Sequence, residues 1–289
     1  MVVAAGNDGR NNTQGINGCG TILAPGNDPL VITVGAMKTM GTPSRSHDLI
    51  ASYSSKGPTA IDHIIKPDLV APGNRVASLL AGTAQLQNQY PNNAVPLTYY
   101  QNTGSGALSN QYYRESGTSM ATPVVSGAAS LLLQRFPAWS PDQVKAVLMK
   151  TASKTFPSSS VATDPNTGAT YTSNYDIFTV GAGYVDVWAA LNATDVAAAS
   201  STALSPTASY NSATGQVLIN NTSALDIWGS NVVWGDRAVF GSNVVWGDNV
   251  VWGDSTLLGF RTVWGSSSIW AATTQTATEG IPLTIAGEN

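Results

Sequence analysis

The chain has 289 residues and a mass of 29.9 kDa, which suits one domain of ordinary size with an appendage, or two small domains. Charged residues make up only 10% of it, the net charge is −4 and the pI is about 5.0, so nothing indicates a basic nucleic-acid-binding surface. No apolar run approaches the roughly 18–20 residues that a membrane span needs. The single cysteine, Cys19, excludes an internal disulfide.

The first residues, MVVAAGNDG, have the pattern of a buried strand that runs into a turn. They contain neither a basic leader nor a long apolar stretch, so they do not form a signal peptide. Because the chain begins inside a strand, we expect a preceding N-terminal part of the domain to be missing.

Residues 1–193 carry the mixed strand and helix signals of an α/β domain. Short apolar runs bounded by Gly, Asn, Asp or Pro predict buried parallel strands. These runs are residues 2–5, 30–34, 51–54 and 68–70. The stretch 80–116 is polar and rich in Asn, Gln and Tyr, and it predicts a long surface loop.

Two helices are predicted in the second half of this region. The segment that follows Ser119 is apolar almost all round, which predicts a helix in the centre of the domain. The next helix begins after Ser140, which can cap it. Pro141 suits the first turn, and Gln143 completes a capping box.

The composition changes after residue 193. Residues 194–226 are rich in Ala, Ser and Thr and predict a linker. From 227 to 270 a large apolar residue recurs every six positions, usually followed by Gly, and residues 271–289 form a tail. The recurring residues are Trp228, Trp234, Phe240, Trp246, Trp252, Leu258, Trp264 and Trp270. Hexapeptide repeats are typical of β-solenoids, so we expect short strands here, with a flexible low-complexity segment as the alternative.

Ser119 lies in ESGTSMATPVVSGAASLLLQ, at the start of the predicted central helix. A serine hydroxyl becomes a good nucleophile when a base accepts its proton. A helix N-terminus offers free N–H groups and positive dipole charge to a developing oxyanion. The same residues also suit a serine that only caps the helix, so both interpretations stay open on this pattern alone.

The string SGTSMATPVVSGAASLLLQ closely resembles the nucleophile motif of the subtilisin-like serine proteases, the subtilases, with Ser119 in the nucleophile position. VVAAGNDG resembles the oxyanion-hole segment of that family. PGNDPLVITVGA, ASYSSKGPTAIDHIIKPDLVAPG, SPDQVKAVLMKTA and VGAGYVDVWAALNA resemble its structural segments, in the same order. The resemblance covers residues 1 to about 193 and implies an incomplete subtilisin-like parallel sheet with flanking helices.

The resemblance also implies roles for single residues. Asn7 would donate its side-chain amide to the oxyanion, although an Asn in Gly-Asn-Asp-Gly is ordinarily a turn residue. Ala4 and Gly6 would line one wall of the pocket for the substrate residue before the scissile bond. The implied reaction is peptide-bond hydrolysis through an acyl-enzyme on Ser119. It needs no cofactor, and no ligands for the family's calcium ion can be identified in this sequence.

The family's triad runs Asp, His, Ser along the chain, with Asp in D-[ST]-G and His in H-G-T-H. Neither motif occurs in these residues. The two histidines, His47 and His63, follow Asn7 and lack the Gly–Thr context, so we interpret both as loop residues. Asp68 matches a structural position and is not interpreted as the acid. The chain alone is therefore predicted to be inactive without its missing N-terminal part.

The leading hypothesis is a subtilisin-type serine endopeptidase that acts on protein or peptide substrates and is extracellular in its full-length form. The alternative is a degenerate, non-catalytic subtilase remnant. In that case the Trp-rich repeat would serve as a binding or structural module.

Overall fold

The computed structural model describes residues 1–11, 16–82, 85–102, 106–157, 159–211, 216–220 and 287–288. Its helices are α1 (Gln85–Gln89), α2 (Thr118–Arg135), α3 (Pro141–Thr151), α4 (Ile177–Val180) and α5 (Val187–Leu191), with short 3-10 turns at Arg45–His47, Pro91–Asn93 and Leu97–Tyr99. Its strands are β1 (Val2–Ala4), β2 (Arg10–Asn11), β3 (Ile16–Asn17), β4 (Ile32–Lys38), β5 (Leu49–Ile50), β6 (Leu69–Pro72), β7 (Val76–Leu79), β8 (Ala94–Pro96), β9 (Leu108–Glu115), β10 (Ser159–Thr163), β11 (Thr170–Asn174), β12 (Thr207–Asn211) and β13 (Gln216–Asn220).

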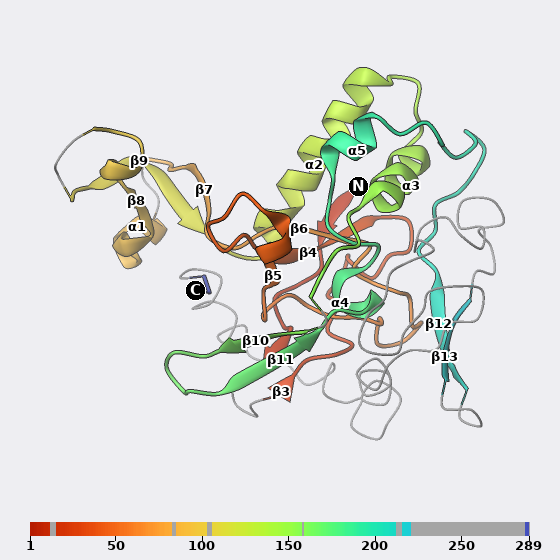
Figure 1. Ribbon diagram of the computed structural model, residues 1–289, viewed down its shortest axis with the longest axis horizontal. Helices are drawn as coiled ribbons and strands as arrows, with labels where there is room; N and C mark the ends of the chain where they lie inside the picture. Colours follow the sequence, from red (N-terminus) through yellow and green to blue (C-terminus); the bar gives the residue numbers. More distant parts are fainter. Residues whose placement is uncertain are drawn as a thin grey trace.

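A four-stranded sheet built around β4 forms the centre of the fold (Figure 1). β4 is buried along its whole length and pairs in parallel with β1 and with β6. β5 pairs with its end in the antiparallel direction, so the sheet is mixed rather than wholly parallel. Among the described residues β1 pairs with β4 alone, which leaves β1 half-buried at an edge of the sheet.

The strands predicted at 2–5, 30–34 and 68–70 are confirmed as β1, β4 and β6, but the strand predicted at 51–54 is wrong. That segment is a turn, closed by a hydrogen bond from Ser54 N–H to Ala51 O. Its residues are buried because Tyr53 packs inside and Ser54 Oγ accepts from Ala36 N–H. The turn satisfies its polar groups through contacts that are distant in sequence, which a local pattern does not reveal.

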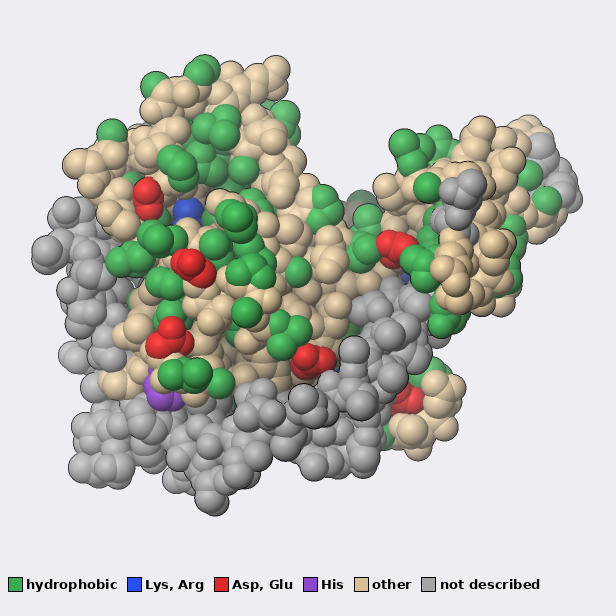
Figure 2. Space-filling view, turned by 180° about the vertical axis from the view of Figure 1, so that it is seen from behind, with side chains coloured by type: hydrophobic (Ala, Val, Ile, Leu, Met, Phe, Trp, Pro, Cys, Tyr) green, Lys and Arg blue, Asp and Glu red, His purple; other side chains and the backbone are tan. Residues whose placement is uncertain are grey.

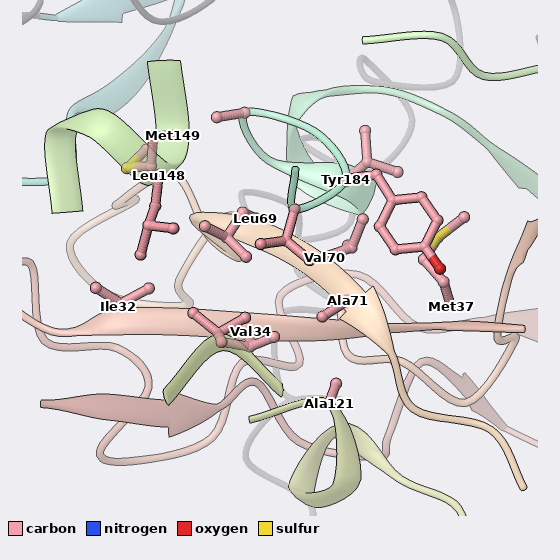
Figure 3. Close-up of a cluster of buried hydrophobic side chains, with 14 of the residues drawn as sticks. Ile32, Val34, Met37, Leu69, Val70, Ala71, Ala121, Leu148, Met149 and Tyr184 are labelled. Atoms are coloured by element: carbon pink, nitrogen blue, oxygen red, sulfur yellow. The ribbon is translucent and has the colours of Figure 1, made fainter. Parts of the chain in front are cut away.

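Two long helices contribute to the core beside the sheet. Figure 3 shows Ala121 of α2 and Leu148 and Met149 of α3 converging on the apolar side chains of β4 and β6. Figure 1 places α2, α3 and α5 together on one part of the molecule. The predicted capping box at Ser140 is confirmed, since Ser140 and Gln143 exchange side chain–backbone hydrogen bonds.

The expectation that α2 lies in the centre of the domain is wrong for the residues described. Only Thr118 and the apolar stripe at Ala121, Val125, Ala128 and Leu132 are buried. Leu131 and Leu133 are 46% and 43% exposed. The composition of the helix is apolar all round, but only one of its faces meets the sheet.

The stretch 80–116, predicted as a loop, contributes to a three-stranded antiparallel sheet in the order β7-β9-β8. The prediction of a surface insertion holds, because this sheet forms a lobe that stands out from the body of the molecule (Figure 2). Its small core includes Val95 and Tyr113, and Tyr113 OH donates to the carbonyls of Leu86 and Tyr90. The polar composition of this stretch did not indicate a sheet, because its few buried residues lie far apart in the sequence.

Part of the predicted linker, 194–226, packs against the first domain. Ala203 and Ala208 belong to the buried core, and the antiparallel hairpin β12–β13 follows. The hexad repeat at 227–270 lies outside the described residues. Within the described part of the chain, none of the helices is long and apolar enough to span a membrane.

Candidate active site

Ser119 occupies the first turn of α2, where the chain turns sharply out of β9. Gly117 is the N-cap and has φ +143°, a conformation that other residues rarely adopt. Pro123 has no N–H to donate to the carbonyl of Ser119, four residues earlier. Ser119 is exposed, in contrast to its fully buried neighbour Thr118.

Asn7 is held against this helix start by its side-chain oxygen. Thr118 N–H donates to Asn7 Oδ1 over 2.9 Å. The Thr118 hydroxyl accepts from Gly6 N–H at 3.1 Å and lies 3.2 Å from both Gly6 O and Asn7 Oδ1, so it can donate to one of them. Because the oxygen is engaged, the Asn7 Nδ2 group remains a donor, and no hydrogen bond from it is found among the described residues.

The same geometry leaves a second donor near Ser119. The first N–H groups of a helix have no acceptor within the helix. Thr118 N–H is taken by Asn7, whereas no acceptor for Ser119 N–H is found in the described part of the chain. A Cβ added to Gly117 would lie 3.4 Å from Asn7 Nδ2. The two donor groups are thus brought to one helix end from segments more than 100 positions apart in the sequence.

Ser119 also lies on the wall of a pocket of about 550 Å³. The opposite walls come from β7 and β9 of the lobe, so the pocket lies between the lobe and α2. Most of its lining is apolar, and Glu115 is its one charged residue. The lining residues are Val76, Ala77, Ser78, Leu79, Leu80, Ala81, Leu86, Tyr113, Glu115, Ser119, Met120, Pro123 and Val124.

Neither Ala4 nor Gly6 lines this pocket. Ala4 is the last residue of β1 and is half-buried. Gly6 is buried with φ +112°, and a Cβ added to it would lie 2.8 Å from Leu23 Cγ and from Ser55 Oγ. The role of Ala4 and Gly6 in binding substrate stays a prediction.

Neither histidine is hydrogen-bonded to Ser119 in the described structure. His47 is exposed in a 3-10 turn, and its Nδ1 lies 3.2 Å from Thr42 Oγ1. His63 is half-buried in a loop beside β12, where its carbonyl accepts from Ala208 N–H. Desolvation lowers the pKa of His63. Both positions agree with the interpretation of these residues as loop histidines.

Asp68, matched by sequence to a structural position, lies in a fully buried ion-pair cluster. Its Oδ2 accepts from Lys66 Nζ and from Thr33 N–H, each at 2.7 Å. Its Oδ1 bonds the Ser205 hydroxyl and lies 3.4 Å from Lys145 Nζ. Burial by itself would raise the pKa of Asp68, but Lys145 and Lys66 hold it below its usual range.

Among the described residues, no group of three or more His, Cys, Asp or Glu side chains could hold a metal ion. Sequence reasoning also missed two features of the site. Thr118 holds Asn7 against the start of α2. In the sequence, only its position next to Ser119 could have indicated this role. The pocket walls at Leu80 and Leu86 belong to the stretch 80–116 that was predicted as a loop.

Comparison with known proteins places this sequence in a family. The model of the Subtilase family, Peptidase_S8, matches residues 1–183. Serine protease AprX of Bacillus subtilis is 39% identical over 148 residues, which are 51% of this chain and 29% of AprX. Subtilisin-like protease SBT1.7 of Arabidopsis thaliana is 35% identical over 145 residues, which are 50% of this chain and 17% of that protease.

Among solved structures, fervidolysin from Fervidobacterium pennivorans, a keratinolytic enzyme related to subtilisin, aligns with a TM-score of 0.42 at 26% identity. That alignment covers 68% of this chain and 23% of fervidolysin. The chain thus matches less than a third of the length of each of these three proteins. The family match includes both Asn7 and Ser119, and by that match the chain belongs to the subtilase family.

Proposed function

We propose that this chain carries the nucleophile and the oxyanion-stabilising half of a serine endopeptidase site. Ser119 would attack the peptide carbonyl and form an acyl-enzyme, and water would then release the acyl group. The observation that carries this proposal is the clamp between Asn7 and Thr118. It fixes the amide oxygen of Asn7 at the helix start and leaves its Nδ2 group free to donate.

The developing negative charge of the tetrahedral intermediate would meet Asn7 Nδ2 and Ser119 N–H. Donors that are already oriented cost no reorganisation during the reaction, which is why they stabilise a transition state efficiently. The positive end of the α2 dipole adds to this effect. The pocket beside Ser119 would accept an apolar side chain of the peptide.

The base would come from outside these 289 residues. The His47 ring contacts Thr42 in its own loop, His63 lies beside β12, and Asp68 is paired with Lys66 and Lys145. We propose that a preceding segment supplies the histidine and the aspartate and packs on the open edge of β1 and the exposed face of α2. Such an enzyme would act outside the cell.

The test joins the part of Bacillus subtilis AprX that precedes its matched region to Met1 of this chain. We expect this chimera to hydrolyse a peptide substrate and to react with a fluorophosphonate probe. Ser119→Ala should abolish both activities, whereas Ser130→Ala, an exposed serine on the same helix, should keep them. A folded chimera that does not react with the probe would refute the role of Ser119.

The unmodified chain is the companion measurement. We expect no Ser119-dependent turnover from it, because no base is within reach. Robust hydrolysis by this chain that is lost in His47→Ala or His63→Ala would show that a loop histidine is the base, contrary to the proposal.

A further inference from the structure

The C-terminal residues Gly287 and Glu288 lie against the catalytic domain, and Glu288 is more than 200 positions away in sequence from Asn74, which it contacts. In Figure 1 they form the short blue segment beside the label C. Glu288 is only 8% exposed, so the segment is inserted rather than laid on the surface. The proposed protease mechanism uses none of these contacts.

The carboxylate of Glu288 meets two buried cations. Lys38 Nζ lies 3.2 Å from Oε2, and Arg10 Nη1 lies 3.4 Å from Oε1. Ser52 N–H donates to Oε2 at 3.1 Å, and the Ser52 hydroxyl bonds Oε1. Arg10 also pairs with Asp164 at 2.8 Å, so two buried cations are matched by two carboxylates. The partners of Glu288 come from β2, from the end of β4 and from the turn that follows β5.

The backbone of Glu288 is held as well as its side chain. Asn74 Nδ2 donates to Glu288 O, and Glu288 N–H donates to Asn74 Oδ1, each at 2.8 Å. An asparagine amide that both donates to and accepts from one residue acts on it as a neighbouring strand would. This contact fixes the position of the peptide, independently of the ion pairs that hold the side chain.

The preceding position accepts only glycine. Gly287 has φ +73°, and a Cβ added there would lie 2.5 Å from Arg75 Cγ and 2.6 Å from Ser116 Oγ. Ser116 directly precedes Gly117, the N-cap of α2. The segment therefore reaches the back of the loop that presents Ser119.

We propose that Arg10, Lys38, Ser52 and Asn74 form a binding site for a Gly-Glu unit, and that its occupant is this chain's own Gly287–Glu288. The site fastens the end of the chain to the domain beside the first turn of α2. Without the carboxylate of Glu288, Arg10 and Lys38 each lose one buried ion pair, and breaking a buried pair by removing one partner is strongly destabilising. The site therefore requires an acidic occupant, and Glu288 supplies it in cis.

The first experiment measures thermal unfolding of the full chain. Glu288→Gln keeps the shape of the side chain but removes its charge, and we expect Tm to fall by about 6–10 °C. The control is Asp195→Asn, which removes a 79% exposed carboxylate paired with Lys150 and should leave Tm nearly unchanged. In Lys38→Met/Glu288→Gln the loss should be smaller than the sum of the two single losses. Equal effects of Glu288→Gln and Asp195→Asn, or additive losses in the double variant, would overturn the proposal.

The second experiment supplies the occupant in trans. The probe is a fluorescein-labelled peptide with the sequence of residues 284–289, TIAGEN. We expect it to bind full-length Glu288→Gln at least about tenfold tighter than the wild type, whose own Glu288 occupies the site. The peptide TIAGQN should not bind either protein.

Equal binding to both proteins, or no binding to Glu288→Gln, would contradict the assignment. If Glu288→Gln is insoluble, refolding with TIAGEN but not with TIAGQN should recover soluble protein. Failure of TIAGEN to do so would count against the proposal. None of these measurements depends on protease activity, so they stand or fall separately from the proposed function.

Discussion

Two polar centres, one at Asp68 and one at Asn7, lie beside the sheet. They differ in whether all of their side-chain polar atoms have hydrogen-bond partners. At the Asp68 centre both carboxylate oxygens are engaged, by two lysines, a hydroxyl and a backbone N–H. At the Asn7 centre the amide oxygen is engaged by Thr118, whereas no partner for Nδ2 is found in the described chain. Asp68 is sealed in the core, and Ser119 beside Asn7 is exposed.

The difference separates a group that stabilises the fold from one that is prepared for a ligand. A fully satisfied buried carboxylate has no capacity left to bind anything else, so it serves to hold segments together. A side chain anchored through one atom keeps its other atom oriented toward an incoming group. Altering Asp68 should therefore lower stability more than activity, whereas altering Asn7 should lower activity more than stability.

The largest expected effect is on stability, at Asp68. In Asp68→Asn the buried Lys66 and Lys145 lose their carboxylate, and we expect the free energy of unfolding to fall by about 3–5 kcal/mol. Urea unfolding followed by fluorescence measures it. The control is Asp195→Asn, which removes a 79% exposed carboxylate paired with Lys150 and should cost about 0–1 kcal/mol. A loss below 1 kcal/mol at Asp68 would remove the distinction between the centres.

The next effect is on activity, at Asn7. In the AprX chimera, Asn7→Ala should lower kcat by about 10²–10³, the value established for one oxyanion-hole donor in a subtilisin. Its unfolding free energy should fall by only about 1 kcal/mol, because it loses one acceptor at a helix N-terminus. Steady-state kinetics and urea unfolding on the same sample check both expectations. Loss of stability in proportion to activity would make Asn7 a structural residue like Asp68.

An intermediate effect is expected at Thr118, which both stabilises the fold and holds Asn7 in position. Thr118→Val keeps the shape but leaves Gly6 N–H buried without its hydroxyl partner, and we expect a loss of about 1–3 kcal/mol. Thr122→Val is the matched control, since the Thr122 hydroxyl bonds only the helix carbonyl of Thr118. Equal losses in the two variants, measured by urea unfolding, would show that Thr118 has no special role in holding Asn7.

The smallest effect is a pH dependence at Lys154, a half-buried residue whose ammonium group contacts carbonyls rather than a carboxylate. Lys154 Nζ donates to Ala152 O at 2.9 Å and Met149 O at 3.2 Å. Desolvation lowers the pKa of Lys154 to about 7, well below the roughly 10.4 that is usual for lysine. Between pH 7 and 9 the unfolded chain therefore binds more protons at this residue than the folded chain. Raising the pH then favours the folded state.

The unfolding free energy of the wild type should accordingly rise more steeply from pH 7 to 9 than that of Lys154→Met. The comparison with the variant is needed because desolvation also lowers the pKa of Lys145, to about 8, which adds to the slope of both proteins. Lys150→Met, a lysine paired with the exposed Asp195, is the control and should keep the wild-type slope. Identical slopes for the wild type and Lys154→Met would refute the prediction.

The sequence by itself determined the features that depend on neighbouring residues. The apolar run at 2–5, the capping box at Ser140 and the start of α2 near Ser119 were all predictable, because each follows from residues within a few positions. The family resemblance over residues 1 to about 193 also came from local motifs, and the family match over 1–183 agrees with it.

Only the tertiary structure decided which polar groups meet. The contact of Thr118 with Asn7, the pairing of Lys145 with Asp68 and the insertion of Glu288 beside Lys38 each join distant segments. The turn at 51–54 and the single buried face of α2 were likewise set by what packs against them. Hydrogen bonds and ion pairs depend on distances of a few ångströms between atoms, and folding alone brings such distant residues together.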